Sequence, residues 1–148
     1  MARFKYRLAP LLKIKENIRT EKQTELAKAY EAQRIVQEQL KQVEEELAKS
    51  TEEGRHFIQE GKISVDFLLS LRRHEAHLLS QKKHANEQLE LIAQEIERRR
   101  IALMEADREV KVLEKLKEKM KIRHLEAENK LAVRQMDEIA GRKRNVSL

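Results

Sequence analysis

The segment STEEGRHFIQEGKIS, residues 50–64, is the one place in the chain where turn residues gather. Within it Gly61 is best suited to end a helix, because glycine adopts the left-handed backbone conformation at little cost. Ser64 and Asp66 follow, and they suit the N-cap and the first turn of a second helix. The sequence therefore predicts a turn at about 61–64 with a helix on either side.

The rest of the chain has the composition of long helices. Of its 148 residues 39% are charged and 3% are aromatic, with three Gly, one Pro, and no Cys or Trp. The abundant Glu, Lys, Arg, Gln, Leu and Ala lose little side-chain freedom in a helix. Pro10 falls where a helix tolerates proline, in its first turn. We expect a single coiled-coil domain over 1–148, with helix one at about 10–60 and helix two at about 65–142.

Apolar residues in the first helix recur at alternating steps of three and four residues, the pattern of a coiled-coil seam. One series of heptad positions holds Leu26, Gln33, Leu40 and Leu47, and the other holds Ala29, Val36 and Val43. Nearer the N-terminus the apolar stripe consists of Leu11, Ile14 and Ile18. This stripe joins Leu26 only through an extra four-residue step at Lys22, which predicts a stutter that locally unwinds the supercoil.

The second helix carries a more regular seam. Residues spaced by sevens are Leu71, Leu78, Ala85, Ile92, Arg99, Ala106, Leu113 and Met120, and the other series contains Leu89, Ile96, Leu103 and Val110. With the turn centred near residues 62 and 63, antiparallel pairing brings the two seams together. The expected neighbours are Leu47 with Leu78, Leu40 with Ala85, Val36 with Leu89, Ala29 with Ile96, and Ile14 with Val110. The predicted fold class is all-α, a long two-helix antiparallel coiled-coil hairpin.

In this register the N-terminal end of the first helix lies opposite about Met120, whereas the helical sequence of the second helix continues to about Arg142. The second helix should therefore overhang by roughly 20 residues, or about 30 Å. An apolar stripe follows the overhang, interrupted by Asn129; its residues are Ile122, Leu125, Val133, Met136 and Ala140. Nothing else in the chain is available to cover this stripe, so the sequence predicts a partner for it.

No pattern in the chain indicates catalysis, a cofactor or a metal. His74 and His77 flank Glu75, but their spacing differs from that of the helical HExxH zinc motif. A two-stranded coiled coil offers no pocket that excludes water from a reacting group, and no glycine-rich phosphate loop is present. We therefore expect no enzymatic activity and no bound cofactor.

The net charge of +6 raises nucleic acid as a partner, but two observations favour a solvated helix surface. Acidic residues alternate with basic ones at spacings of three and four, as with Glu114 and Lys117 or Glu118 and Lys121. Aromatic side chains that could stack on bases are nearly absent.

The basic, apolar N-terminus also suggests membrane association. We expect instead that it grips the second helix near Leu113.

Three segments carry a resemblance to a known family. They are the opening FKYRLAPLL (4–12), LEKLKEK (113–119) and the ending QMDEIA (135–140). In residues, order and separation, these segments resemble the FliJ family of flagellar type III export proteins.

The resemblance implies a cytoplasmic component of the flagellar export apparatus, peripheral at the inner face of the cell membrane and similar to the rotary stalk subunit of F-type ATPases. It implies binding to the hexameric export ATPase FliI and to the export-gate protein FlhA. Export chaperones are further candidate partners, and no nucleic acid is expected.

The resemblance also assigns candidate binding residues. Those expected to bind the ATPase, at the ends of the helices, are Leu8, Leu11, Leu12, Ile122, Leu125, Val133, Met136, Asp137, Glu138 and Ile139. Those expected to bind the export gate are Leu40, Val43, Leu47, Leu71, His74 and Leu78. The alternative function is that of a general coiled-coil export chaperone or tether that acts without the ATPase.

Overall fold

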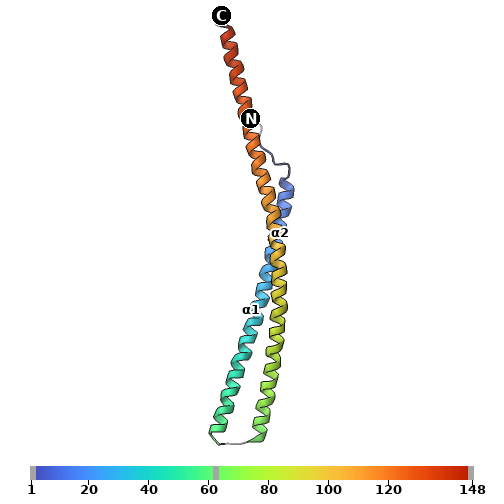
Figure 1. The fold of residues 1–148 in the computed structure, drawn as a ribbon, viewed down its shortest axis with the longest axis vertical. Coiled ribbons are helices and arrows are strands. Elements are labelled where there is room, and N and C mark those ends of the chain that lie inside the picture. The colour runs from blue at the N-terminus through green and yellow to red at the C-terminus, as the bar shows by residue number, and fades with distance from the viewer. Residues whose placement is uncertain (1–2, 62–63, 147–148) are drawn as a thin grey trace. The chain divides into compact units, whose positions relative to one another are not determined.

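The computed structural model describes residues 3–61 and 64–146, and within these ranges the chain forms two helices and no strand. Helix α1 spans Ala9–Gln59 and helix α2 spans Val65–Val146, with 51 and 82 residues (Figure 1). The two long helices pack against each other. This confirms the prediction of an all-α helical hairpin.

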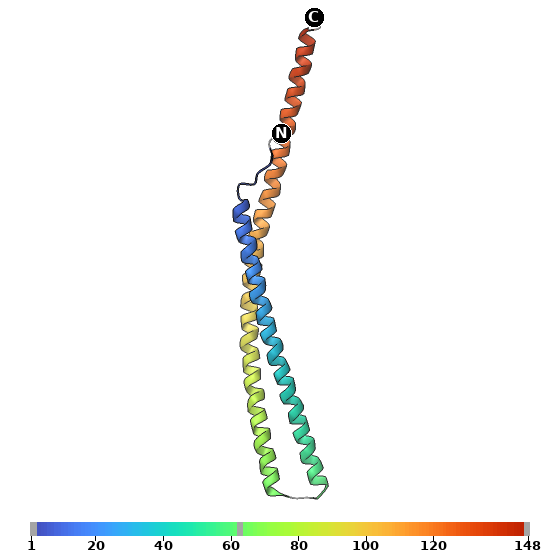
Figure 2. The same ribbon diagram turned by 180° about the vertical axis from the view of Figure 1, so that it is seen from behind.

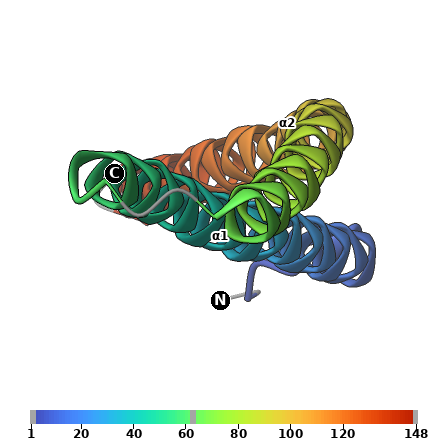
Figure 3. The same ribbon diagram turned by 90° about the horizontal axis from the view of Figure 1, so that it is seen from below.

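The helix ends beside the turn have the local structure that their residues favour. Gly61 has a φ of 72°, and its backbone N–H donates to the carbonyl of Ile58 at 3.2 Å. At the start of α2 the hydroxyl oxygen of Ser64 accepts a hydrogen bond from the backbone N–H of Phe67 at 3.4 Å. Figure 3 shows the end of α1 and the start of α2, both drawn in green. Lys62 and Ile63, the centre of the predicted turn, lie outside the described residues.

The structure divides into two compact units, which we describe one at a time. The turn unit is formed by Lys22–Leu103 and contains both helix ends that flank the turn. The terminal unit combines the start of the chain, up to Glu21, with the chain from Met104 onward.

In the turn unit the two helices are antiparallel and meet along the predicted seams. Buried and half-buried side chains on α1 include Leu26, Ala29, Val36, Leu40 and Leu47; on α2 they include Leu71, Leu78, Ala85, Leu89 and Ile96. Cross-helix contacts fix the register. Lys82 Nζ lies 3.7 Å from Glu44 Oε1, and the rings of Phe57 and Phe67 are 4.3 Å apart. Both pairs are nearly equidistant in sequence from the predicted turn centre, so the register agrees with the one derived from heptads.

Gly54 packs directly against Leu71 of α2. A Cβ atom at this glycine would lie 2.9 Å from Leu71 Cδ2, closer than such contacts normally occur. One helical turn earlier, Ser50 is buried, and its hydroxyl has no hydrogen-bond partner among the described residues. Small side chains at these two seam positions therefore allow the close approach.

The terminal unit has its own apolar core, built around Tyr6, Leu12 and Val110. Phe4, Leu8, Leu113 and Met120 pack against this core cluster. Residues 3–8 precede α1 and lie along α2, beside its orange segment in Figures 1 and 2; we call them the strap.

Side chains of the strap alternate between two environments. Phe4, Tyr6 and Leu8 are buried or half-buried, whereas Arg3, Lys5 and Arg7 between them are exposed. Such alternation is that of extended backbone, whose successive side chains point to opposite sides. The Tyr6 hydroxyl donates to the Leu113 carbonyl at 2.9 Å, and the Phe4 ring lies 5.6 Å from the His124 ring. The apolar residues of the N-terminus thus grip α2, as we expected.

The core of the terminal unit differs from the sequence prediction in one respect. Ile14 is 54% exposed and Leu11 40%, whereas Leu12 is buried at 7% and joins Val110 in the core cluster. Pairing of Ile14 with Val110 was therefore wrong. The predicted stutter was also wrong, because heptad spacing continues without interruption; the seam positions from the strap to Leu26 are Leu8, Leu12, Lys15, Arg19 and Lys22.

Two of these seam positions, Lys15 and Arg19, hold cations whose charges find partners on α2. Lys15 Nζ lies 2.9 Å from Glu109 Oε2, and Arg19 Nη1 lies 3.2 Å from Asp107 Oδ1. All four side chains are partly exposed. Their aliphatic stems cover the seam while the charged ends reach its edge, so the heptad spacing continues without the predicted stutter.

Two neighbouring leucines test the turn-unit seam. Leu78 is 1% exposed and Leu79 is 55% exposed. Leu78→Ala should lower the free energy of unfolding by about 2 kcal/mol or more, because it leaves a cavity between the helices. Leu79→Ala should change it by less than about 0.5 kcal/mol. Urea unfolding followed by circular dichroism measures both, and equal effects of the two variants would contradict this helix pairing.

Candidate partner-binding surfaces

Beyond His124 the strap no longer covers α2. Every described residue from 129 to 145 is exposed, and α2 continues to Val146. This uncovered segment, residues 125–146, is roughly 30 Å long at 1.5 Å per residue. We call it the overhang; it forms the red end of α2 in Figure 1.

The overhang carries large exposed apolar side chains. Leu125 is 50% exposed, Val133 57%, Met136 72% and Ile139 57%. Residues Ile122, Leu125, Asn129, Ala132, Met136 and Ile139 follow steps of three and four without a break. This is the spacing of a coiled-coil contact face, and none of these residues is covered. We call these six residues the apolar stripe.

The apolar stripe does not continue the seam that faces the strap. Met120 and His124 are half-buried on the strap side, and Ile122 lies midway between them in sequence. A step of two residues turns a helix by roughly 200°, which puts Ile122 on the opposite side of α2. The stripe is therefore a separate surface that a longer α1 would not have covered.

All ten residues predicted to bind the ATPase lie in the terminal unit. Leu12 is buried and Leu8 is half-buried, so these two hold α1 and the strap on α2. The other eight are exposed: Leu11, Ile122, Leu125, Val133, Met136, Asp137, Glu138 and Ile139.

Next to the core cluster, Asp107 is held between two cations. Lys111 Nζ lies 2.9 Å from its Oδ2, and Arg19 Nη1 lies 3.2 Å from its Oδ1. The hydrogen bond from Lys111 lowers the pKa of Asp107 below its ordinary value of 3.8, and Arg19 lowers it further, while partial burial opposes both. The carboxylate therefore links α1 and α2 in its charged form.

Of the residues predicted to bind the export gate, most fill the seam of the turn unit. Leu78 is 1% exposed, and Leu40, Val43, Leu47 and Leu71 are half-buried. His74 alone is exposed.

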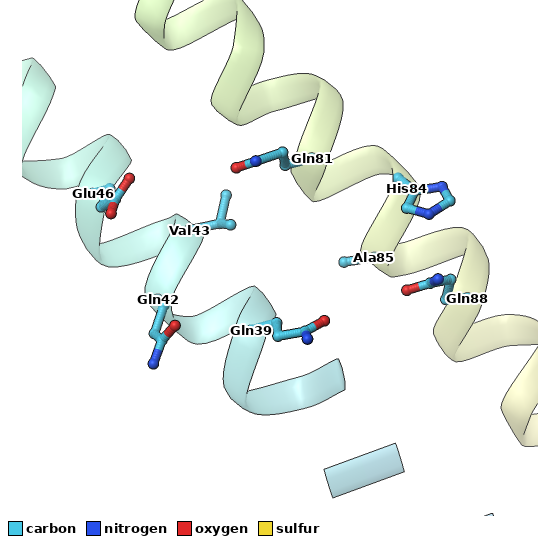
Figure 4. Close-up of a pocket in the computed structure, with 8 residues that line it drawn as sticks. All are labelled: Gln39, Gln42, Val43, Glu46, Gln81, His84, Ala85 and Gln88. Atoms are coloured by element: carbon cyan, nitrogen blue, oxygen red, sulfur yellow. The ribbon is translucent and has the colours of Figure 1, made fainter. Parts of the chain in front are cut away.

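A groove of about 370 Å³ opens between the helices at this level of the turn unit, shown in Figure 4. Its lining comes from both helices: Gln39, Gln42, Val43 and Glu46 on α1, and Gln81, His84, Ala85 and Gln88 on α2. Val43 is the only residue of the predicted gate set among those lining it.

The sequence prediction missed this groove because its lining residues flank the seam. A signal was present at Ala85, a seam position where a small side chain leaves space between the helices. Four glutamines around that position supply amide donors and acceptors at the edge. The groove is thus a polar-rimmed surface with a small apolar floor.

The histidines singled out from the sequence do not form a metal site in the described part of the chain. No three His, Cys, Asp or Glu side chains there are placed to hold a metal ion. The ring Nε2 of His77 lies 3.2 Å from Gln81 Nε2. Among the described residues, no helix is long and apolar enough to cross a membrane.

Comparison with protein families decides the identity of the chain. The model of the flagellar FliJ protein matches residues 4–147. The chain belongs to the FliJ family. The match includes the strap from Phe4 onward, both helices and the apolar stripe. Comparisons with curated proteins and with solved structures gave no match.

Membership in the FliJ family makes the protein a component of the flagellar export apparatus. Members of this family are non-catalytic export components with a helical coiled-coil fold. Surfaces that bind other proteins are therefore the features of this structure that bear on function.

The ion cluster around Asp107 predicts a pH dependence. Because the pKa of Asp107 is lowered in the folded protein, its charge stabilises the fold above the ordinary value of 3.8. This contribution is lost as the pH falls through the lowered value. Asp107→Asn should therefore be less stable than the wild type at neutral pH, and the difference should shrink well below pH 3.8.

Urea unfolding at neutral and acidic pH measures this difference. Asp137→Asn is the matched control, because Asp137 lies on the overhang and makes no ion pair with a described residue. A constant difference between Asp107→Asn and wild type across the pH range would contradict the role of the charged carboxylate.

Proposed function

We propose that this FliJ-family protein binds the hexameric export ATPase FliI through its terminal unit and the export-gate protein FlhA through its turn unit. In this proposal it works at the cytoplasmic face of the membrane, as a stalk that regulates the ATPase. The observation that carries the proposal is the exposed apolar stripe on the overhang, centred on Leu125 and Met136.

The uncovered helix supports a partner at this end of α2. A single helix gains most of its stability in proteins by packing an amphipathic face, whereas residues 129–145 of the overhang are all exposed. Its apolar stripe has unbroken heptad spacing, while Glu126, Lys130 and Arg134 lie on other sides of the helix. Contiguous exposed apolar surface of this kind marks an interaction site.

The groove in the turn unit supports a second contact. Its glutamine amides can donate and accept hydrogen bonds, and Val43 and Ala85 supply an apolar floor. We place the gate contact there. The other residues that the family resemblance assigned to the gate are Leu40, Leu47, Leu71, His74 and Leu78; most of them support this surface from the seam.

Asymmetry provides a mechanism for regulating the ATPase without any bond chemistry. A helix with one apolar side presents different faces to the subunits of a ring around it. A ligand that binds two conformations with different affinity shifts their populations. Unequal contacts from the apolar stripe would therefore favour different conformations in different ATPase subunits.

Variants of the stripe test the proposal. Leu125→Gln, Met136→Gln and Ile139→Gln, combined in one chain, remove apolar surface but retain good helix formers. If the stripe binds the ATPase, stimulation of ATP hydrolysis should fall by about tenfold or more, as for loss of central hot-spot contacts. The matched control combines Ile35→Gln, Leu79→Gln and Leu91→Gln, which are exposed residues of the turn unit.

A truncation after Lys130 complements these variants, since it keeps the contact of Phe4 with His124. It should abolish stimulation while the remaining helices stay folded. Equal stimulation by the wild type, the stripe variant and the truncated chain would refute the terminal contact. No stimulation by the wild type would favour the alternative of a chaperone or tether that acts without the ATPase.

A further inference from the structure

Positive charge is concentrated in the terminal unit. Of the 32 Lys and Arg and the 26 Asp and Glu in the chain, 18 and 11 belong to this unit, which leaves 14 and 15 in the turn unit. The net charges are therefore +7 and −1. The whole positive excess of the protein belongs to the unit that carries the overhang.

The cations of the two units also differ in their partners. In the turn unit many are paired with a carboxylate; these are Lys22, Arg34, Arg72, Lys82, Arg98, Arg99 and Arg100. Around the strap the situation is different. Eight exposed cations there make no ion pair with any described residue: Arg3, Lys5, Arg7, Lys115, Lys117, Lys119, Lys121 and Arg123. We call these eight residues the basic collar.

The acidic neighbours of the basic collar make no direct ion pair with it among the described residues. Glu114 and Glu118, which the sequence suggested as partners of Lys117 and Lys121, make no ion pair within the described ranges. Lys115, Lys119 and Arg123 follow one another at steps of four residues, so like charges are stacked along the helix. This arrangement costs stability, which an anionic partner would restore.

The collar surrounds α2 on several sides. Lys117 and Lys119 are two residues apart and therefore point in nearly opposite directions on a helix of about 3.6 residues per turn. The strap adds Arg3, Lys5 and Arg7, whose neighbours Phe4 and Tyr6 pack on α2. A flat membrane or a DNA duplex could contact only one side of such a collar. A concave acidic surface could contact all of it.

A lipid bilayer and a second copy of this chain both fit the basic collar poorly. Phe4, Tyr6 and Leu8 are engaged with α2, so no apolar side chain of the strap remains free to enter a lipid bilayer. A second copy paired in parallel along the apolar stripe would bring two basic collars together, and like charges at an interface oppose association.

We infer that the basic collar binds an acidic protein surface that encloses it. This inference rests on the proposed function, because it assigns that surface to the inside of the ATPase ring, beside the site that binds the apolar stripe. The collar supplies long-range attraction and the stripe supplies apolar contact. Charge of this kind mainly accelerates association and depends strongly on ionic strength.

Charge reversal tests the collar. Binding of the full-length chain to the ATPase is measured for Lys115→Glu, Lys119→Glu and Arg123→Glu combined. The control is Lys41→Glu, Lys49→Glu and Arg55→Glu, three exposed cations of the turn unit without ion pairs to described residues. We expect the Kd to rise about tenfold or more for the collar variant and to change little for the control. A Gln version of the collar variant, which relieves the repulsion along α2, should lose affinity as well.

Site-directed crosslinking tests enclosure. The chain has no cysteine, so Lys117→Cys and Lys119→Cys each give a single attachment point for a maleimide benzophenone. Both should crosslink to the ATPase. Crosslinking from only one of them would overturn the enclosing surface.

The outcomes separate this inference from the proposed function. Wild-type affinity in the collar variant, with binding lost in the stripe variant, would overturn the collar and leave the proposed function standing. No binding of the wild type to the ATPase would overturn both. Vesicles of phosphatidylcholine and phosphatidylglycerol, and duplex DNA, serve as probes at the same salt concentration. Collar-dependent binding to either probe, without collar-dependent binding to the ATPase, would also overturn the inference.

Discussion

Burial of one seam between two helices of unequal length is the constraint on which the rest of this structure depends. The seam residues follow heptad spacing in both helices, and the contacts on either side of the turn fix an antiparallel register. Helix α2 has 82 residues and α1 has 51, so part of α2 must lie beyond the seam. In the terminal unit the strap covers one side of α2 as far as His124, and the apolar stripe starts at Ile122 on the opposite side.

Much of this followed from the sequence because heptad spacing is read directly from residue numbers. The helical hairpin and the uncovered residues Ile122, Leu125 and Met136 on α2 could be predicted in this way, whereas the unbroken spacing of the stripe includes Ala132 and Ile139 in place of the predicted Val133 and Ala140. The burial of Leu12 could not be predicted, since Leu11 and Ile14 are equally apolar and spacing alone did not show that the cations Lys15 and Arg19 would reach carboxylates on α2. The groove beside Val43 and the missing partners of the collar depend on side-chain positions, which sequence spacing does not fix.

Charge has different roles in the two units. In the turn unit ion pairs such as Arg34 with Glu31 and Arg100 with Glu97 stay on one helix and stabilise it locally. In the terminal unit, charges cross between helices at Asp107 and are left unpaired at the basic collar. The packed seams thus hold the helices together, whereas the exposed surfaces available to partners lie on the overhang and at the groove.

Hydrogen–deuterium exchange of the full-length chain, free and bound to the export ATPase, tests the central claim most directly. Backbone amides of an uncovered helix open locally and exchange faster than those of a packed pair. The account predicts strong protection on binding in the overhang, with smaller protection at the strap and collar and none around the groove. Protection confined to the turn unit, with the overhang exchanging as fast as in the free chain, would contradict it.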